Sequence, residues 1–349
     1  MGSVNPCAFE TASKEGILNM NIKGYLRNRK LLPIVAVVLL VVPLALYVSS
    51  RDNSTGPIGD VSFMAIENIR IKEFKPEEPE IIKTIEDNKI YKSYLIAYRS
   101  EGLRITGLMN VPEGKGPFPV IFLNHGHYQF DKYRTGDGTR EAADLFARNG
   151  YVAVSPDYRN YGGSDKGSEL FFTGYVYDLI NLIESVKRLE YVDKNRIGLR
   201  GHSMGAAIVL KTIVIRDDIK AAAVFGSMSP DDIENYNTLI KWGVPMGKTV
   251  RKDFGTPKNN PELYYKMSPI NYFKDISAAV LIHAGGQDEI TPPNWSIKLK
   301  DALLKEGKAA EYHFYPEQGH IFKGKAWDEA MERTLAFFDH HLKGRIKTN

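Results

Sequence analysis

Short apolar runs alternate with longer segments of helical periodicity from residue 118 to residue 342. Runs such as 118–123 are continuously apolar, as expected of strands that are covered on both faces. Strands that alternate with helices build a mostly parallel, twisted sheet with helices on both faces, so we expect an α/β fold. The expected strands are 118–123, 151–154, 196–199, 220–225, 279–283 and 310–314, and the expected helices are 141–149, 176–189, 204–214, 296–305 and 326–342.

Two segments before this region follow a different pattern. Residues 89–98 and 103–111 alternate between apolar and polar side chains and are rich in Tyr, Ile and Val, which predicts two half-buried antiparallel strands. In mostly parallel sheets, ligands bind beyond the carboxyl ends of the strands. The residues directly after each apolar run are therefore the first candidates for a functional site.

The composition fits a globular chain with a sizeable core and excludes several other classes. The chain is 43% hydrophobic, 25% charged and 11% aromatic, which argues against disorder and low complexity. The single cysteine, Cys7, excludes a disulfide framework and a cysteine-based zinc site. The formal net charge of +4 is small and dispersed, so we expect no nucleic-acid partner.

The N-terminal part contains a candidate membrane anchor. Residues 31–48 carry no charge and form an aliphatic run long enough to cross the hydrocarbon core of a lipid bilayer as a helix. Lys and Arg are concentrated before this run, so the positive-inside rule predicts a cytoplasmic tail at residues 1–30. Residues 49–60 have the Ser, Gly, Pro and Asp content of a linker. We therefore expect a single-pass protein of the cell membrane, with one large domain, residues 61–349, on the extracytoplasmic side.

A cleaved signal peptide is the alternative interpretation of the same run. Val48-Ser49-Ser50 has the small residues of a cleavage site. The stretch before the apolar run is long for a signal peptide, however, which favours an uncleaved anchor.

A serine flanked by glycines follows the expected strand 196–199. The sequence Gly201-His202-Ser203-Met204-Gly205 leads directly into an expected helix. Glycines on both sides let the backbone pass closely through a tight strand-to-helix turn, which lifts the serine hydroxyl clear of the sheet above the helix N-terminus. Ser203 is therefore a candidate nucleophile, and a purely structural turn is the alternative.

A nucleophilic serine needs a base, and the base needs an acid that orients it. The expected strand 279–283 ends in a Gly-rich loop with Asp288 and Glu289, and His320 follows the expected strand 310–314. Both loops fall at the edge of the sheet that carries the serine, in the order serine, acid, histidine. We expect Asp288 to be the acid and His320 the base, with Glu289 as the alternative acid.

The loop after the expected strand 118–123 is Asn124-His-Gly-His-Tyr128. A tetrahedral intermediate needs hydrogen-bond donors for its oxyanion, each worth about 3–4 kcal/mol. We expect the backbone amides of Met204 and His127 to be these donors, with the Gly126 amide or the His125 side chain as alternatives for the second. The two histidines lack a convincing third ligand, so we expect no metal.

An aromatic-rich insertion, residues 231–274, separates the expected strands 220–225 and 279–283. Its tryptophan and tyrosines predict a partial lid and a pocket for the acyl or leaving group, and simple packing onto the sheet is an equally good interpretation. We expect Trp242 of this insertion, together with Tyr128, to contact the substrate.

These motifs together resemble one protein family. The chain is similar to the catalytic domain of the prolyl oligopeptidase-like α/β-hydrolases (peptidase family S9) over about residues 90–343. The resemblance implies an α/β-hydrolase fold in which Ser203 is the nucleophile, Asp288 the acid and His320 the base, with no metal or organic cofactor. The matching segments are PFPVIFLNHG at 117–126, PDYRNYGGS at 156–164, GHSMG at 201–205, SPINY at 268–272, LIHAGGQDEITP at 281–292 and YPEQGH at 315–320.

Three departures from the family pattern bear on the substrate. The β-propeller of the oligopeptidases has no counterpart before the first expected strands, the loop at 125–128 reads His-Gly-His-Tyr, and Ile290 stands where the peptidases often have Arg. We therefore expect a serine hydrolase that cleaves an ester or amide acyl bond of a small molecule or short peptide, with a carboxylesterase slightly preferred. The alternatives are an S9-type exopeptidase acting on short peptides and, from another class, a non-catalytic binding module.

Overall fold

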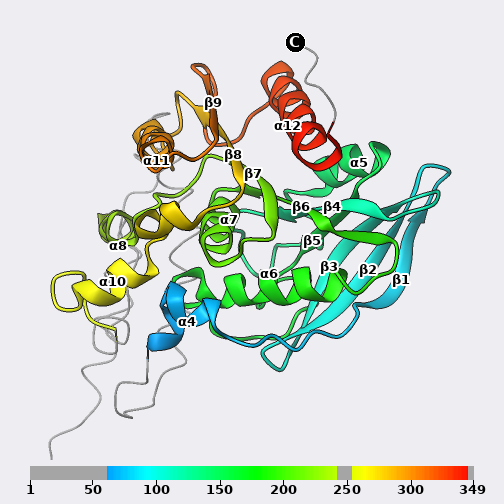
Figure 1. The fold of residues 1–349 in the computed structure, drawn as a ribbon, viewed down its shortest axis with the longest axis horizontal. Helices are drawn as coiled ribbons and strands as arrows, with labels where there is room; N and C mark the ends of the chain where they lie inside the picture. Colours follow the sequence, from blue (N-terminus) through cyan, green and yellow to red (C-terminus); the bar gives the residue numbers. More distant parts are fainter. Residues whose placement is uncertain (1–60, 242–253, 345–349) are drawn as a thin grey trace, which may run out of the picture.

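The computed structural model describes residues 61–241 and 254–344, whose strands form one nine-stranded sheet in the order β1-β2-β3-β5-β4-β6-β7-β8-β9 (Figure 1). Neighbouring strands are antiparallel from β1 to β5 and parallel from β5 to β9 along this order. The mostly parallel sheet that the alternation predicted is therefore confirmed. The strands are β1 (Glu80–Asp87), β2 (Tyr91–Ser100), β3 (Leu103–Pro112), β4 (Phe118–Asn124), β5 (Val152–Pro156), β6 (Val192–His202), β7 (Ile219–Phe225), β8 (Ala279–Gly285) and β9 (Ala310–Tyr315).

Helices cover both faces of the sheet. Figure 1 shows α5 and α12 next to each other on one face, where the rings of Phe146 and Phe338 are in contact with centroids 5.6 Å apart. Helices α6, α7 and α11 pack on the other face and enclose the larger part of the apolar core. The helices are α4 (Ile66–Arg70), α5 (Arg140–Arg148), α6 (Thr173–Val186), α7 (Met204–Ile215), α8 (Asp232–Lys241), α10 (Pro261–Met267), α11 (Pro293–Lys305) and α12 (Lys325–Lys343), with 3-10 helices η1 (Ser62–Met64), η2 (Leu170–Phe172) and η3 (Pro269–Asp275).

The order of the strands defines where a ligand binds. The chain leaves β4, crosses one face through α5 to β5, and then crosses the other face through α6 to reach β6 on the opposite side of β4. Connections that leave neighbouring strands in opposite directions open a crevice at the carboxyl ends of those strands. The loops after β4 and β6 border this crevice.

Two strands differ from the sequence-based expectation. Strand β1 was not predicted, because it lies at the edge of the sheet and its side chains are almost all exposed. Strand β6 is longer than the predicted 196–199, because its first half is polar and half-exposed while the second half is buried. Strand β1 is held by pairing with β2, although it has no apolar run of its own. In the first half of β6, Val192 pairs with Phe118 of β4 before the register shifts to Ile197.

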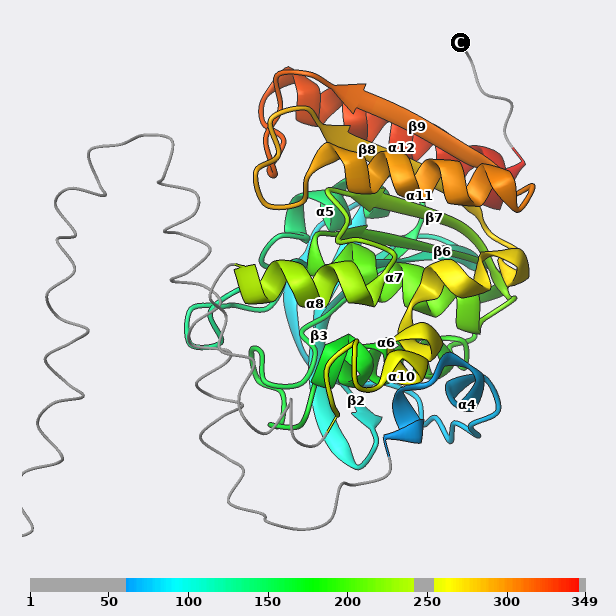
Figure 2. The ribbon, with the colours of Figure 1, turned by 90° about the vertical axis from the view of Figure 1, so that its left-hand side faces the viewer.

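The described part of the insertion 231–274 consists of α8, α10 and η3. Tyr236 and Tyr264 are buried in a small core with Met64 of η1, and α10 lies beside α4 (Figure 2). Lys211 of α7 forms a buried ion pair with Asp232 at 2.5 Å. This part therefore packs onto the domain, and its role as a lid stays a prediction.

The predicted cytoplasmic tail, membrane span 31–48 and linker 49–60 lie outside the described residues. Within residues 61–241 and 254–344, no helix is both long and apolar enough to cross a membrane.

Candidate active site

Ser203 lies in a sharp turn between β6 and α7. Its backbone has φ 55° and ψ −118°, a conformation that residues other than glycine rarely adopt. Its amide donates to the carbonyl of Phe225 at the end of β7 (3.0 Å), and its carbonyl accepts from the amides of Ala206 (3.0 Å) and Ala207 (3.2 Å). These bonds hold the strained turn, with the half-buried serine at the carboxyl edge of the sheet.

Close backbone contacts require the two glycines of the motif. A Cβ atom on Gly201 would clash with the backbone of Gly205, and one on Gly205 would clash with the carbonyl of Asn124 at the end of β4. Gly126 packs against the same turn, since a Cβ atom there would lie 3.4 Å from Cβ of Ser203. The loop after β4 is therefore in direct contact with the serine turn.

Asp288 and His320, from the loops after β8 and β9, are hydrogen-bonded. Nδ1 of His320 donates to Oδ2 of Asp288 at 2.9 Å. Oδ1 accepts from the amides of Ile290 (2.9 Å) and Thr291 (2.8 Å), and the Thr291 hydroxyl donates to Oδ2 at 2.7 Å. Burial alone would raise the pKa of Asp288, but its hydrogen bond to His320, the charge of His320 and the Thr291 bonds hold it below its usual value. The exposed alternative, Glu289, makes no such bond within the described chain.

His202 joins the serine turn to the loop of His320. Its Nε2 lies 2.9 Å from the His320 carbonyl oxygen, and the two rings are 4.7 Å apart. Burial, together with the charge of His320, lowers the pKa of His202 from 6.5 to about 3. The ring is therefore neutral at ordinary pH, and Nε2 carries the proton that it donates to the carbonyl.

Gly226 at the end of β7 completes the contact between the serine turn and the acid–histidine pair. A Cβ atom on Gly226 would lie 3.1 Å from both Oδ2 of Asp288 and Nδ1 of His320. Within the described residues, the Ser203 hydroxyl makes no hydrogen bond to the His320 ring. Hydrogen bonds of this kind are often long or misaligned until a substrate binds.

The loop after β4 presents backbone donors to the serine turn. His125 is fully buried, and its two ring nitrogens lie 2.6 and 3.1 Å from backbone carbonyl oxygens, so its side chain has no donor left for an oxyanion. His127 is half-buried, with Nδ1 3.0 Å from the Tyr161 hydroxyl. Met204 is the first residue of α7, and amides of a first helical turn have no acceptor inside the helix.

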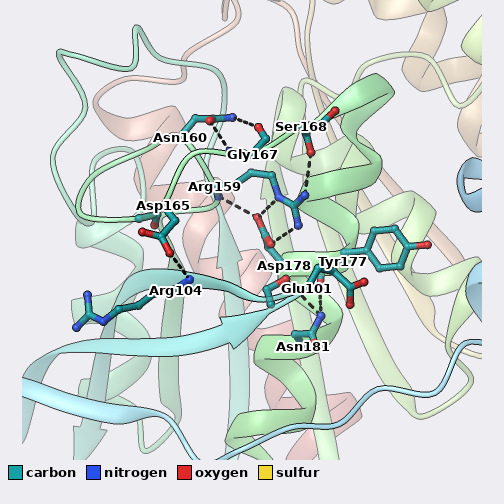
Figure 3. Close-up of polar contacts among 12 residues, drawn as sticks. Glu101, Arg104, Arg159, Asn160, Asp165, Gly167, Ser168, Tyr177, Asp178 and Asn181 are labelled. Carbon is teal, nitrogen blue, oxygen red and sulfur yellow. Dashed lines mark hydrogen bonds and ion pairs between the residues drawn. The ribbon is translucent and has the colours of Figure 1, made fainter. Parts of the chain in front are cut away.

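The loop after β5 supports the loop after β4. Asp157 is buried and accepts hydrogen bonds from three hydroxyl groups at 2.6, 2.7 and 3.0 Å. Arg159 donates to both oxygens of Asp178 in α6 (2.8 and 3.0 Å) and to the Ser168 carbonyl at 2.8 Å (Figure 3). This buried ion pair fixes the segment that carries Tyr161, whose hydroxyl contacts the His127 ring.

A pocket of about 900 Å³ opens beside His320. Tyr128, His202, Arg200 and the N-terminal turns of α5 and α12 line it, so Tyr128 borders a cavity, while Trp242 lies outside the described residues. None of the described residues of the insertion lines this pocket. In the part of the chain that the structure describes, no cluster of His, Cys, Asp or Glu is arranged to hold a metal ion.

Three residues of this region were not predicted from the sequence. Arg200 is fully buried in β6, and its charge between the apolar Leu199 and a glycine was the available signal. Thr291 and Gly226 contact the acid–histidine pair, but only their positions just after strands pointed to them.

Comparisons with known proteins find one matching family model and several peptidase relatives. The model of the prolyl oligopeptidase family (Peptidase S9) matches residues 138–345. The uncharacterized peptidase YtmA of Bacillus subtilis is 28% identical over 234 residues, which cover 66% of this chain and 87% of that protein. A probable dipeptidyl-aminopeptidase B of Coccidioides posadasii is 27% identical over 58% of this chain, but the match covers only 22% of that protein.

Solved structures share the fold. An acylaminoacyl peptidase in complex with Z-Gly-Gly-Phe-chloromethyl ketone matches with a TM-score of 0.59 and 21% identity, over 80% of this chain and 52% of its own. The acetyl xylan esterase from Paenibacillus sp. R4 matches with a TM-score of 0.62 and 19% identity, over 83% of this chain and 97% of its own. This chain therefore spans about half of the peptidase and nearly all of the esterase.

The mixed, mostly parallel sheet with a serine in a strand-to-helix turn is the fold of an α/β-hydrolase. The protein is a serine hydrolase. The family match covers more than half of the chain. The chain belongs to the prolyl oligopeptidase family, peptidase family S9, which confirms the resemblance drawn from its motifs.

Proposed function

We propose that Ser203, His320 and Asp288 form a catalytic triad that cleaves an ester or amide acyl bond through an acyl-enzyme. The observation that carries this proposal is the 2.9 Å hydrogen bond between Asp288 and Nδ1 of His320, next to the turn that holds Ser203. A proton on Nδ1 leaves Nε2 of His320 free of a proton, which is the state that a general base needs.

The reaction runs in two steps. Oγ of Ser203 attacks the acyl carbon while Nε2 of His320 takes the hydroxyl proton, and the same proton then passes to the leaving alcohol or amine. Water next attacks the acyl-enzyme, again losing its proton to His320, and this proton returns to Ser203 as the acid is released. Asp288 stays ionised throughout and stabilises the imidazolium, in line with its lowered pKa.

Two backbone amides stabilise the oxyanion of the tetrahedral intermediate. Met204 supplies one from the first turn of α7, and His127 supplies the other from the loop that packs on Ser203 through Gly126. The buried His125 ring and the hydroxyl of Tyr161 hold this loop in place before the substrate arrives. Preorganised donors of this kind lower the barrier because they need no reorientation during the reaction.

Small or medium acyl esters are the preferred substrates of this site. Ile290 and the His-Gly-His-Tyr loop both depart from the peptidase pattern, which supports a carboxylesterase. The second candidate is an exopeptidase of short peptides, and the peptidase relatives from Bacillus subtilis and Coccidioides posadasii favour it.

Rates on matched chromogenic substrates separate these candidates. We expect kcat/KM for 4-nitrophenyl acetate and butyrate to exceed that for aminoacyl 4-nitroanilides by orders of magnitude, and Ser203→Ala to remove both activities. An amide-to-ester ratio near one would favour the exopeptidase instead. Equal background rates for wild type and Ser203→Ala on every substrate would favour a non-catalytic binding module.

For the cellular location, residues 31–48 support a single-pass anchor with the catalytic domain outside the cytoplasmic membrane, because positive charge precedes the span. Protease added to intact cells or spheroplasts should digest the catalytic domain. Protection of the domain, with digestion only after lysis, would reverse this topology.

A further inference from the structure

Arg200 of β6 carries a buried charge, and two of its nitrogens have no acceptor among the described residues. Its side chain is 1% exposed, and Nε and Nη1 have no hydrogen-bond partner in the part of the chain that the structure describes. No carboxylate among the described residues pairs with its guanidinium. Burial lowers the pKa of Arg200 to about 10, so the group is still charged at neutral pH. A buried cation of this kind is costly unless an anion compensates it.

Aromatic rings hold the guanidinium but leave its donors unused. Its Cζ atom lies 4.5 Å from the ring of Phe225 and 5.4 Å from the ring of Trp327. Rings interact with the face of a guanidinium, whereas its N–H groups point outward in the plane. Within the described residues, Nε and Nη1 are therefore buried donors without an acceptor, and the planar fork of a guanidinium matches a bidentate oxyanion such as a carboxylate.

Arg200 lines the pocket of about 900 Å³ that also borders His320 and His202. The N-terminal turns of α5 and α12 line the same pocket. Amides at helix N-termini favour an anion, and here two of them accompany a buried cation. Both the cation and the helix ends thus favour negative charge in a cavity next to the proposed base.

Charged side chains at the rim nearly balance one another. Arg140 and Lys323 oppose Glu141 and Asp328, and all four are exposed. A further charged residue that lines the pocket, Asp137, is half-buried and accepts a hydrogen bond from a backbone amide at 2.8 Å. Exposed charges are screened by salt, whereas a buried charge is screened much less. Among the charged residues that line this pocket, Arg200 is therefore the one that solvent screens least.

We propose that this pocket is a subsite in which Arg200 binds a carboxylate carried by the substrate. The inference rests on the proposed hydrolase function, because it assigns the carboxylate to the molecule whose acyl bond is cleaved beside His320. The preferred substrates are then acidic small molecules, with a free carboxylate near the scissile bond, rather than neutral esters.

Binding of an uncleaved probe to Ser203→Ala protein tests this proposal. Monomethyl glutarate carries the ester and a free carboxylate, and its neutral counterpart has a carboxamide in place of the carboxylate. At constant ionic strength, calorimetry should give at least tenfold tighter binding of the acid than of the amide. Adding Arg200→Met should remove this difference, Arg200→Lys should retain part of it, and the distant exposed Arg148→Met should leave it unchanged.

Two results would overturn the carboxylate subsite: equal affinity for the acid and the amide, or an unchanged preference in Arg200→Met protein that remains folded by circular dichroism. Inorganic phosphate that binds more tightly than monomethyl glutarate would also overturn it. Arg200→Met is expected to fold, because it removes an unpaired buried charge and leaves no partner behind. Hydrolysis of neutral 4-nitrophenyl acetate by the wild type reports separately on the triad, so failure of the subsite and failure of the hydrolase are distinguishable.

Discussion

Replacing Asp288 by asparagine tests the proposed triad by changing a tautomer while keeping the shape of the site. The side-chain oxygen of the introduced asparagine can still accept from the amides of Ile290 and Thr291, which lie 2.9 and 2.8 Å from Oδ1 of Asp288. The amide nitrogen then takes the place of Oδ2, which accepts from His320 at 2.9 Å. Two donors cannot face each other, so His320 is driven to carry its proton on Nε2, where it cannot act as a base for Ser203.

The expected loss in kcat is about four orders of magnitude, the size typical of this substitution in a Ser-His-Asp triad. That loss corresponds to about 5 kcal/mol of activation free energy. Stability should change much less, because only the two hydrogen bonds to Oδ2, from His320 and Thr291, are exchanged and the two backbone bonds to Oδ1 remain.

The assay is hydrolysis of 4-nitrophenyl butyrate by wild type, Asp288→Asn and the neighbouring control Glu289→Gln, with folding checked by thermal unfolding. Glu289→Gln should keep wild-type activity because its side chain is exposed and lies off the acid–histidine pair. A folded Asp288→Asn protein that keeps more than about a tenth of the wild-type kcat would refute the reasoning, and a loss in Glu289→Gln instead would move the acid to that residue.

Three further predictions follow from the supporting contacts. His202 stays neutral in the folded protein down to about pH 3 but takes up a proton below about pH 6.5 in the unfolded chain, so it lowers the free energy of unfolding as pH falls. In urea titrations between pH 7 and 4, His202→Gln should reduce the decrease in this free energy by about 1 kcal/mol per pH unit. Gly226→Ala should lower kcat more than it lowers stability, because the new methyl group would lie 3.1 Å from Asp288 and its φ of 47° disfavours alanine; wild-type kcat would contradict this packing. Arg159→Met should lower the free energy of unfolding by about 3–5 kcal/mol, because it leaves the buried charge of Asp178 without its partner. Adding Asp178→Leu to this variant should restore part of that loss. Equal stability of the single and double variants would argue against a charge effect.

The sequence predicted the sheet well where side chains alone carry the signal. Strand β4 and helix α7 consist mostly of apolar residues, and both begin at the predicted residue. Edge strand β1 was not predicted, because its stability comes from pairing with β2 and not from buried side chains of its own. Local periodicity records burial, but it does not record hydrogen bonds between strands.

The candidate site shows the same division between local and long-range information. Asp288 and His320 were predicted because glycines and strand ends mark their loops, and the structure brings the two side chains together. Nε and Nη1 of Arg200 lack an acceptor among residues 61–241 and 254–344 because the fold keeps the carboxylates of these residues out of reach, and no local pattern encodes that. The hydrogen bond between His202 and the His320 carbonyl likewise joins residues that are 118 positions apart in the sequence.

Covalent labelling by a fluorophosphonate tests the nucleophile most directly. Peptide mapping by mass spectrometry should find one phosphonylated residue, Ser203, in the wild-type protein, with no adduct in Ser203→Ala and much slower labelling in Asp288→Asn. An adduct on another serine, or a folded wild-type protein that takes up no probe, would contradict the account.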